Sequence, residues 1–285
     1  MPALSPGHSS SDSDTTAAQM AALAALYPAK LQKVAAFDRF GHYRLETGEQ
    51  LLVWTPVYPA GPLPLIIYLH GASSRGDDIH QIFEKGPGCP PALLRAGDIA
   101  PRAVVVAPLL AAKREWCKTS REAATTLKII DAYFAEEARG AMAAVDRDRV
   151  YVTGPSCGGL GAYTLAARLA RRGDGFSDRC PPAAAVVPVC GGGSVVFAPL
   201  LAKTPCWFWH SESDSAVPCS DTEALVAALE KLDAPVRFTK LTDEETPESP
   251  PYVAYMTHHN AWTPAYKVDS PMWAWLFAQS REEGP

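Results

Sequence analysis

Ten residues, TGPSCGGLGA at positions 153–162, combine two potential nucleophiles with closely spaced glycines. Ser156 and Cys157 are adjacent, and a glycine stands two residues before and two residues after the serine. This Gly-x-Ser-x-Gly spacing is typical of a serine nucleophile on a sharp strand-to-helix turn, where only small residues let the chain fold back. For Cys157 the earlier position would be Pro155, so the pattern favours Ser156.

Two other interpretations of the stretch involve no nucleophile. A phosphate-binding Walker loop requires a lysine after its second glycine, whereas Leu160 and Gly161 follow here, so that interpretation fails. A glycine-rich helix start without any chemistry would fit the motif alone. The flanks favour the nucleophile, because 149–154 has the apolar pattern of a short strand and 158–173 that of a helix.

A serine hydroxyl at neutral pH needs a general base, and the base needs an acid that orients it. In chains that carry this turn, the order along the sequence is serine, acid, histidine. His210 closes an expected strand ahead of the acid candidates and is interpreted as structural. The adjacent His258 and His259, in MTHHNAWTPAY (256–266), follow the last expected strand, which is where the base is needed.

The acid is expected in the loop after a strand. Segment 209–218, WHSESDSAVP, continues from a strand-like run and offers Glu212 and Asp214. The carboxyl ends of strands form the usual active edge of an open α/β sheet. Later acids have ordinary explanations. Asp221 falls in the first turn of an expected helix, where it complements the helix dipole, and the acids of 242–252 form a solvated charge run.

A site of this kind also needs two backbone N–H groups that stabilise a developing oxyanion. One is expected from Cys157, directly after the serine. The other is expected from the loop after the strand-like run LIIYLH, within YLHGASSRGDD (68–78), where Ala72 is the first choice and Ser73 the second.

Nearly continuous apolar strands alternate with helical segments over most of the chain. An antiparallel hairpin is expected first, at 40–57, where apolar and polar residues alternate around a Thr-Gly turn. Further strands are expected at 63–70, 103–109, 149–154, 183–192, 206–210 and 235–241, and helices at 120–138, 158–173, 220–232 and 271–280. Strands this apolar predict an α/β fold with a mostly parallel sheet and helices on both faces.

Composition excludes several classes of function. The chain has 285 residues, a net charge of −5 and no basic run, which argues against nucleic acid as a partner. Its longest apolar stretches are strand-length, well short of the roughly 20 residues of a membrane span. Residues 1–27 are expected to form a disordered or partly helical arm without the features of a secretory signal, and 28–285 a single domain.

Seven cysteines are irregularly spaced and include no Cys-x-x-Cys pair, so no metal site is expected. Several fall in strand-like runs, where cysteine behaves as a small apolar residue. We therefore expect reduced thiols and an intracellular, cytoplasmic protein. No Gly-x-Gly-x-x-Gly follows a strand, and no cofactor is expected. The oligomeric state is left open.

Four segments, taken in their order along the chain, resemble the α/β hydrolases. More narrowly, they resemble the carboxylesterase and polyhydroxybutyrate-depolymerase-like esterases, a group that includes predicted peptidases. The segments are LHGASSRGDD (69–78), DRDRVYVTGPSCGGLGAY (146–163), WHSESDSAVP (209–218) and HNAWTPAY (259–266). Together they frame the chain from about residue 63 to its end.

The resemblance implies the α/β-hydrolase fold and a serine hydrolase that cleaves a carboxylic ester or thioester through an acyl-enzyme. Ser156 matches the family's nucleophile. The family's acid pattern, His-Gly-x-x-Asp-x-x-Val-Pro, implies Asp214 and not Glu212 as the acid. Its base precedes an Asn/Asp-Ser/Ala-Trp run, which implies His259, with His258 as the runner-up. Acyl transfer, peptide cleavage and a non-catalytic ligand-binding role of the same fold remain as alternatives.

The sequence constrains the residues that would contact a small-molecule acyl substrate less than it constrains the catalytic residues. Trp116, which follows a strand, and Trp262, which follows the base, are candidates for lining the cleft, although core packing explains each tryptophan equally well. Arg75 and Arg114 are candidates for contacts with an acidic group of a substrate. The acidic, Pro-rich segment 242–252 is expected to border the site as a partial lid.

Overall fold

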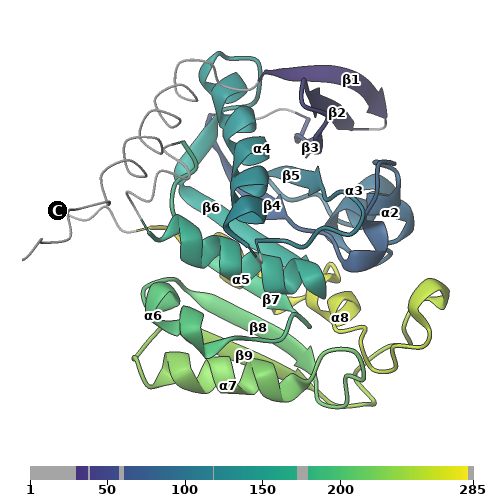
Figure 1. Cartoon of the computed structure of the whole chain (residues 1–285), viewed down its shortest axis with the longest axis vertical. Helices are drawn as coiled ribbons and strands as arrows, with labels where there is room; N and C mark the ends of the chain where they lie inside the picture. The colour runs from purple at the N-terminus through teal and green to yellow at the C-terminus, as the bar shows by residue number, and fades with distance from the viewer. Residues whose placement is uncertain (1–29, 38, 58–60, 118, 172–178, 282–285) are drawn as a thin grey trace, which may run out of the picture.

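The computed structural model describes residues 30–37, 39–57, 61–117, 119–171 and 179–281. The N-terminal arm expected at 1–27 lies outside the described residues. Within them, a single nine-stranded sheet runs through the molecule, flanked by helices (Figure 1).

The sheet is mixed, with an antiparallel start and a parallel remainder. Its strand order is β1-β2-β3-β5-β4-β6-β7-β8-β9. The pairs β1–β2, β2–β3 and β3–β5 are antiparallel, and all later pairs are parallel. The strands are β1 (Leu31–Phe37), β2 (Phe40–Leu45), β3 (Gln50–Trp54), β4 (Leu63–Tyr68), β5 (Val104–Leu109), β6 (Val145–Pro155), β7 (Ala185–Val189), β8 (Cys206–Ser211) and β9 (Val236–Leu241). The predicted hairpin and mostly parallel sheet are confirmed.

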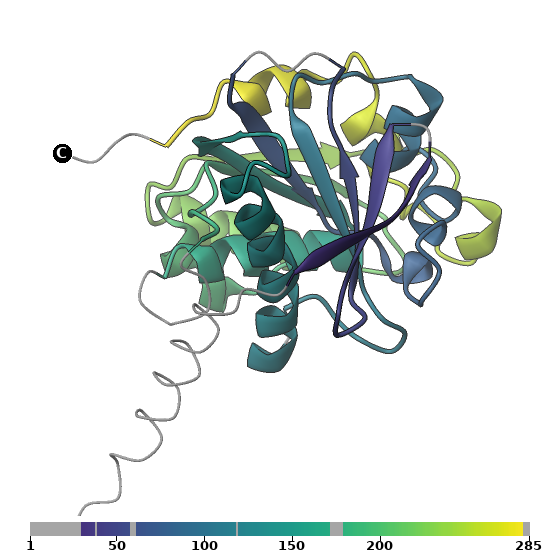
Figure 2. The same ribbon diagram turned by 90° about the horizontal axis from the view of Figure 1, so that it is seen from above.

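Helices cover both faces of the sheet, as predicted (Figures 1 and 2). Because neighbouring strand residues point to opposite faces, Leu65 and Ile67 belong to one core and Ile66 and Tyr68 to the other. The first core is covered by α4 (Ser120–Ala138), α5 (Cys157–Leu169), α6 (Ala198–Leu201) and α7 (Cys219–Glu230). The second is covered by α2 (Gln81–Glu84), α3 (Pro90–Ala96), α8 (Trp262–Tyr266) and α9 (Pro271–Phe277). Short 3₁₀ turns complete the fold as η1 (Ala72–Ser74), η2 (Val195–Phe197) and η3 (Pro251–Val253).

Among the strands that the structure describes, β1 is the one that the sequence pattern does not indicate. Only Leu31 is buried at its start, whereas the side chains of 32–36 are exposed. An edge strand exposed on both faces has no alternation of apolar and polar residues to recognise. It is fixed instead by pairing with β2 and by a backbone hydrogen bond, in which the N–H of Leu31 donates to the Glu136 carboxylate.

The turn from β6 into α5 packs against the end of β4 without space for side chains. A Cβ atom on Gly154 would lie 2.1 Å from the carbonyl oxygen of Leu69, and one on Gly158 would lie 1.8 Å from the same oxygen. Leu69 cannot move away freely, because its N–H donates to the Thr153 carbonyl at 2.9 Å. Both positions flanking Ser156 therefore require glycine for close backbone approach.

We expect Gly158→Ala to lower the free energy of unfolding by about 3 kcal/mol or more, because the new methyl group overlaps backbone atoms that have no room to shift. Urea unfolding followed by circular dichroism measures this. The matched control is Gly71→Ala, in which the nearest atom to the added Cβ is 3.7 Å away and φ is −69°. That variant should stay within about 1 kcal/mol of the parent protein. Equal unfolding midpoints for the two variants would contradict the close-approach argument.

Candidate active site

Ser156 occupies a strained backbone position at the carboxyl end of β6. It is the residue before α5, with φ 56° and ψ −123°, a region that residues other than glycine rarely adopt. Its N–H donates to the Val189 carbonyl at 2.8 Å, and its own carbonyl accepts from the N–H groups of Gly159 and Leu160. The neighbouring strand β7 and the first turn of α5 thus hold the strained conformation.

Three side chains that are far apart in the sequence form one chain of hydrogen bonds. His259 Nε2 lies 2.9 Å from Ser156 Oγ, and His259 Nδ1 lies 2.7 Å from Asp214 Oδ2. The His259 imidazole and the Asp214 carboxylate are buried, whereas Ser156 is partly exposed. The structure therefore brings together the serine, the histidine and the acid that the sequence singled out, in the geometry of a nucleophile, a base and an orienting group.

Asp214 is held from both sides in the loop after β8. Its Oδ1 accepts from the backbone N–H groups of Ala216 and Val217, at 2.8 and 3.0 Å. Its Oδ2 accepts from His259 and lies 3.1 Å from His210 Nε2. Glu212, the other acid considered in this loop, has an exposed side chain. The carboxylate at 214 is therefore the one placed to contact the histidine.

His210, interpreted from the sequence as structural, contacts the acid directly. Its ring is fully buried, and its Nε2 faces both Asp214 Oδ2 and the Val217 carbonyl at 3.0 Å. Since both are acceptors, Nε2 carries a hydrogen and donates to them. The other ring nitrogen lies 2.8 Å from Thr222 Oγ1. The spacing of four positions from a strand-end histidine to the acid is the sequence signal of this contact.

The hydrogen bonds to Asp214 lower the pKa of its carboxyl group by more than burial raises it. Burial by itself would raise the pKa of the carboxyl group, but the hydrogen bonds from His210 and His259, the His259 charge and the Val217 N–H bring it well below its ordinary value. The acid is therefore ionised at neutral pH despite its buried position.

His258, the runner-up for the base, faces elsewhere. It has a left-handed backbone, with φ 55°, and its Nδ1 lies 3.4 Å from Asp243 Oδ1 near the surface. Its side chain is partly exposed. The structure places His259, and not His258, beside Ser156.

Cys157 and Ala72 each begin a helical turn next to Ser156. Cys157 is the first residue of α5, so its N–H belongs to the group that lacks an intrahelical acceptor. Ala72 is the first residue of η1 and lines the same cavity as Ser156. The Cys157 thiol lies 3.7 Å from the His70 carbonyl, and burial raises its pKa to about 11. The thiol is thus protonated at neutral pH and is a poor nucleophile.

Ser156 opens onto a cavity of about 310 Å³. Trp262 lines it, and its ring meets the His259 ring edge to face at 5.7 Å. The Trp262 Nε1–H donates to the Pro87 carbonyl at 3.1 Å, so the ring is fixed in place. The remaining lining residues include Tyr68, Ser73, Lys85, Cys89, Tyr252, Val253, Tyr255 and Met256.

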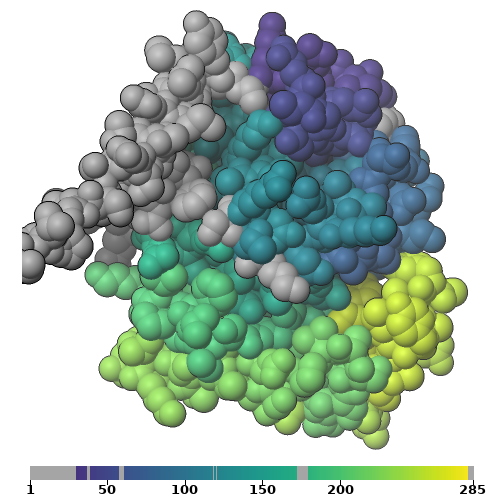
Figure 3. Space-filling view, in the orientation of Figure 1, coloured from purple at the N-terminus to yellow at the C-terminus, as the bar shows by residue number. Residues whose placement is uncertain are grey.

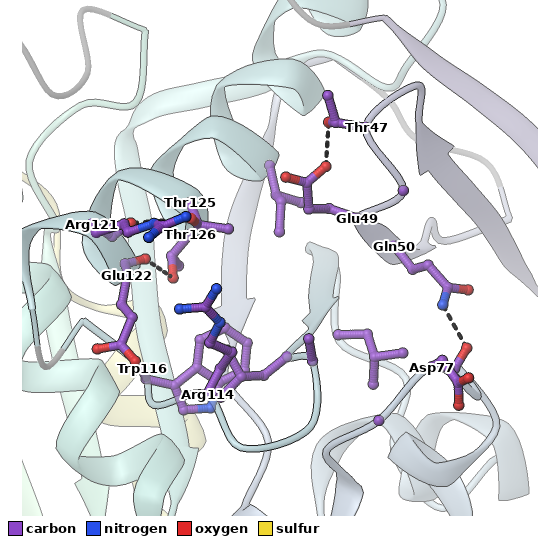
Figure 4. Close-up of a pocket in the computed structure, with 16 residues that line it drawn as sticks. Thr47, Glu49, Gln50, Asp77, Arg114, Trp116, Arg121, Glu122, Thr125 and Thr126 are labelled. Carbon is purple, nitrogen blue, oxygen red and sulfur yellow. Dashed lines mark hydrogen bonds between the residues drawn. The ribbon is translucent and has the colours of Figure 1, made fainter.

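Trp116 does not line the cavity at Ser156. It lines a different cavity of about 460 Å³, together with Arg114, between the β2–β3 turn and the start of α4 (Figure 4). The Trp116 ring is buried, and its Nε1–H donates to the His70 carbonyl at 2.8 Å. It therefore supports the loop that carries Ala72 from behind. Arg75 is not a lining residue of either cavity and pairs with Glu115 at 3.2 Å.

Segment 242–252 borders the site but is not simply a solvated loop. The buried Thr246 hydroxyl donates to Ser211 Oγ at the end of β8, and Ser249 Oγ donates to the Met256 carbonyl. At its end, Tyr252 lines the cavity at Ser156. The acidic residues project outward while the segment itself is anchored, which accounts for its fixed position beside the cavity.

In the part of the chain that the structure describes, no cluster of three or more His, Cys, Asp or Glu residues is arranged to hold a metal ion. No helix among the same residues has the length and apolarity needed to cross a membrane.

His70 links the cavity loop to β5 through its buried imidazole. Its Nδ1–H donates to the Gly71 carbonyl at 2.7 Å, and its Nε2 accepts from the Leu110 N–H at 2.9 Å. Burial lowers the pKa of His70 to about 4, and the positive charge of Arg75 acts in the same direction. The folded protein therefore holds this imidazole neutral at pH values where an exposed histidine is protonated.

We expect this histidine to make folding sensitive to mild acid. The unfolded chain binds a proton on His70 below about pH 6.5, whereas the folded chain does so only near pH 4. Neutral His70 therefore makes its full contribution to the free energy of unfolding above pH 6.5. That free energy falls by roughly 3 kcal/mol in total as the pH falls toward 4. Urea midpoints between pH 4.5 and 7.5 should fall less steeply in His70→Gln than in the parent. His80→Gln, at an exposed histidine, is the control. Parallel pH profiles for parent and His70→Gln would contradict the expectation.

No protein-family model and no curated protein is a significant match to the chain. Solved structures do match. A thermostable esterase is 25% identical, with a TM-score of 0.62 over 82% of this chain and 60% of that chain, so the present chain spans less than two thirds of that esterase. A predicted dienelactone hydrolase from Klebsiella pneumoniae is 18% identical, with a TM-score of 0.55 over 88% and 98% of the two chains.

A third match is esterase 2 from Thermogutta terrifontis, phosphorylated by paraoxon. It is 14% identical, with a TM-score of 0.50 over 75% of this chain and 82% of that chain. Likeness at this level of identity concerns the fold. With its sheet order and its helices on both faces, the protein has the α/β-hydrolase fold that its sequence motifs predicted, and its solved structural neighbours are esterases and related hydrolases.

Proposed function

We propose that the protein is a serine hydrolase that cleaves carboxylic esters through an acyl-enzyme. The observation that carries the proposal is the continuous hydrogen-bonded chain from Ser156 Oγ through His259 to Asp214, with distances of 2.9 and 2.7 Å. Ser156 and His259 line a cavity, and Ser156 follows directly on the carboxyl end of a strand, the edge of the sheet where α/β proteins bind their ligands.

In the proposed reaction, Ser156 Oγ attacks the ester carbonyl while His259 Nε2 takes the hydroxyl proton. The protonated imidazole then gives that proton to the leaving alcohol, which leaves the acyl group on Ser156. Water, deprotonated by the same nitrogen, attacks the acyl carbonyl and releases the acid. Asp214 keeps the imidazole in the required tautomer by accepting from Nδ1–H and stabilises its charged form.

The backbone N–H groups of Cys157 and Ala72 are proposed to stabilise the oxyanion of each tetrahedral intermediate. Both belong to the first residue of a helical turn, and both turns meet at Ser156. Such N–H groups lack partners within their own helix and are aligned before the substrate arrives. Their fixed orientation supports the proposal, because catalysis then requires no reorganisation of the loop.

Ester hydrolysis is favoured over peptide cleavage by the size of the cavity. At about 310 Å³, it lies at the lower end of the ~300–1,000 Å³ that is typical of ligand sites, which suits a small ester better than an extended peptide. Acyl transfer to an alcohol other than water uses the same groups and is the second candidate. Only the acceptor of the acyl group separates the two reactions.

A fluorophosphonate probe tests the proposed nucleophile. The parent protein should be labelled and should hydrolyse p-nitrophenyl acetate, and Ser156→Ala should lose the label and at least about 10³-fold in kcat. Ser215→Ala, at an exposed serine next to Asp214, is the control and should be labelled like the parent. A panel of esters with acyl chains of increasing length then measures the depth of the cavity. Full turnover by Ser156→Ala would exclude the proposal.

His210 is proposed to be a positioning residue that acts through Asp214. In His210→Leu the Asp214 carboxylate loses a hydrogen-bond donor and its fixed orientation, so kcat for p-nitrophenyl acetate should fall by about tenfold or more while KM changes little. His210→Gln, which keeps an N–H donor, should recover part of the loss. Circular dichroism at the assay temperature confirms that each variant is folded. An unchanged kcat in folded His210→Leu would show that His210 has only a packing role.

A further inference from the structure

The cavity at Ser156 has an uneven distribution of charge. Tyr68, Tyr252, Tyr255 and Trp262 supply aromatic walls, and Lys85 is the cationic residue among the described residues that line the cavity. The lining residues within the described part of the chain include no Asp or Glu. An ammonium group beside aromatic walls acts in a medium of lower dielectric than water, which strengthens its attraction for an anion.

The backbone of Lys85 is fixed at the rim of this cavity. Its N–H caps α2 by donating to the Gln81 carbonyl, and its own carbonyl accepts from the Tyr252 hydroxyl at 2.7 Å and from Ser73 Oγ at 3.3 Å. The contact with Tyr252 joins positions separated by 167 residues. In the space-filling view, the C-terminal part of the chain lies against the segment that contains α2 and α3 (Figure 3).

The ammonium group itself is oriented by an aromatic ring. Lys85 Nζ lies 5.2 Å from the centre of the Tyr252 ring, a cation–π distance. No carboxylate among the described residues lies within ion-pair distance of it. The Lys85 residue as a whole is half-buried.

The acids of the neighbouring segment 242–252 do not offset this charge inside the cavity. Asp243 faces His258, and the Glu245 carboxylate accepts from the N–H and hydroxyl of Thr242. Neither lines the cavity. The negative charge of these two residues is therefore directed away from the cavity, which Lys85 lines.

We propose that Lys85 makes this site selective for small esters that carry a second group in the form of an ionised carboxylate. This inference rests on the proposed ester hydrolysis. The carboxylate would pair with Lys85 Nζ while the ester carbonyl lies at Ser156, and the limited volume of the cavity keeps the two ends of such a substrate a few bonds apart. Charge-assisted hydrogen bonds of this kind are stronger than neutral ones.

Two matched pairs of esters test the preference and locate the charge. Monomethyl succinate and methyl succinamate have the same shape and differ by a carboxylate or an amide on the acyl side. Acetoxyacetate and acetoxyacetamide differ in the same way on the alcohol side. Titration of released acid at constant pH gives kcat/KM for each. We expect the anionic member of at least one pair to be hydrolysed about tenfold more efficiently, as one charge-assisted contact provides. The preference should shrink as salt is raised.

The variants then assign the preference to Lys85. Lys85→Met should reduce kcat/KM for the anionic ester about tenfold more than for its amide partner, Lys85→Arg should keep most of the preference, and Lys85→Glu should reverse it. The control is Arg114→Gln, which removes a cation that lines the other cavity. It should leave the ratio of kcat/KM for the anionic ester to kcat/KM for its amide partner unchanged.

The outcomes separate this inference from the proposed function. If the parent hydrolyses both members of each pair equally, or if Lys85→Met lowers both equally, the carboxylate preference is wrong although ester hydrolysis stands. If no ester is hydrolysed and Ser156 is not labelled by the fluorophosphonate, the proposed function itself fails. A Lys85-dependent ratio in either pair supports the inference and shows on which side of the ester the charge lies.

Discussion

The close contact between one carbonyl oxygen and two glycines determines the rest of the site. The Leu69 oxygen at the end of β4 occupies the space that a side chain at 154 or 158 would need. Two strands and a helix can approach this closely only if both positions lack Cβ atoms. The approach places the turn with Ser156 against the loop with Ala72, so backbone packing, and not the packing of rotatable side chains, positions the serine and the loop.

The hydrogen bonds of Asp214 fix the second part of the site, the acid and the histidine. Asp214 accepts four hydrogen bonds, two from backbone N–H groups and two from imidazoles. A buried carboxylate is costly unless its oxygens are satisfied, and here the donors come from two loops and one strand end. His210 and His259 thus share one oxygen, with the strand-borne histidine fixing the acid and the loop-borne histidine reaching the serine.

Much of this arrangement could be predicted from the sequence, because it depends on local patterns. The glycine offsets around Ser156, the apolar strands and the order of serine, acid and histidine each depend on neighbouring residues. The features that escaped prediction depend on long-range packing. Trp116 follows a strand in the expected way, yet its ring turns behind the cavity loop to reach the His70 carbonyl. Residues 32–36 of strand β1 are exposed on both faces, so they show no alternation of apolar and polar residues that would indicate a strand.

The hydrogen bond from Tyr252 to the Lys85 carbonyl also has a consequence for the order in which the site is completed. The nucleophile turn lies near the middle of the chain, the base is 103 residues further on, and the cavity wall joins positions 167 residues apart. During synthesis from the N-terminus, the sheet through β7 and the glycine turn are available well before the segment with Tyr252 and His259. Ser156 and its turn are therefore synthesised before the base, and His259 and the Tyr252 side of the cavity wall are added together by one later segment.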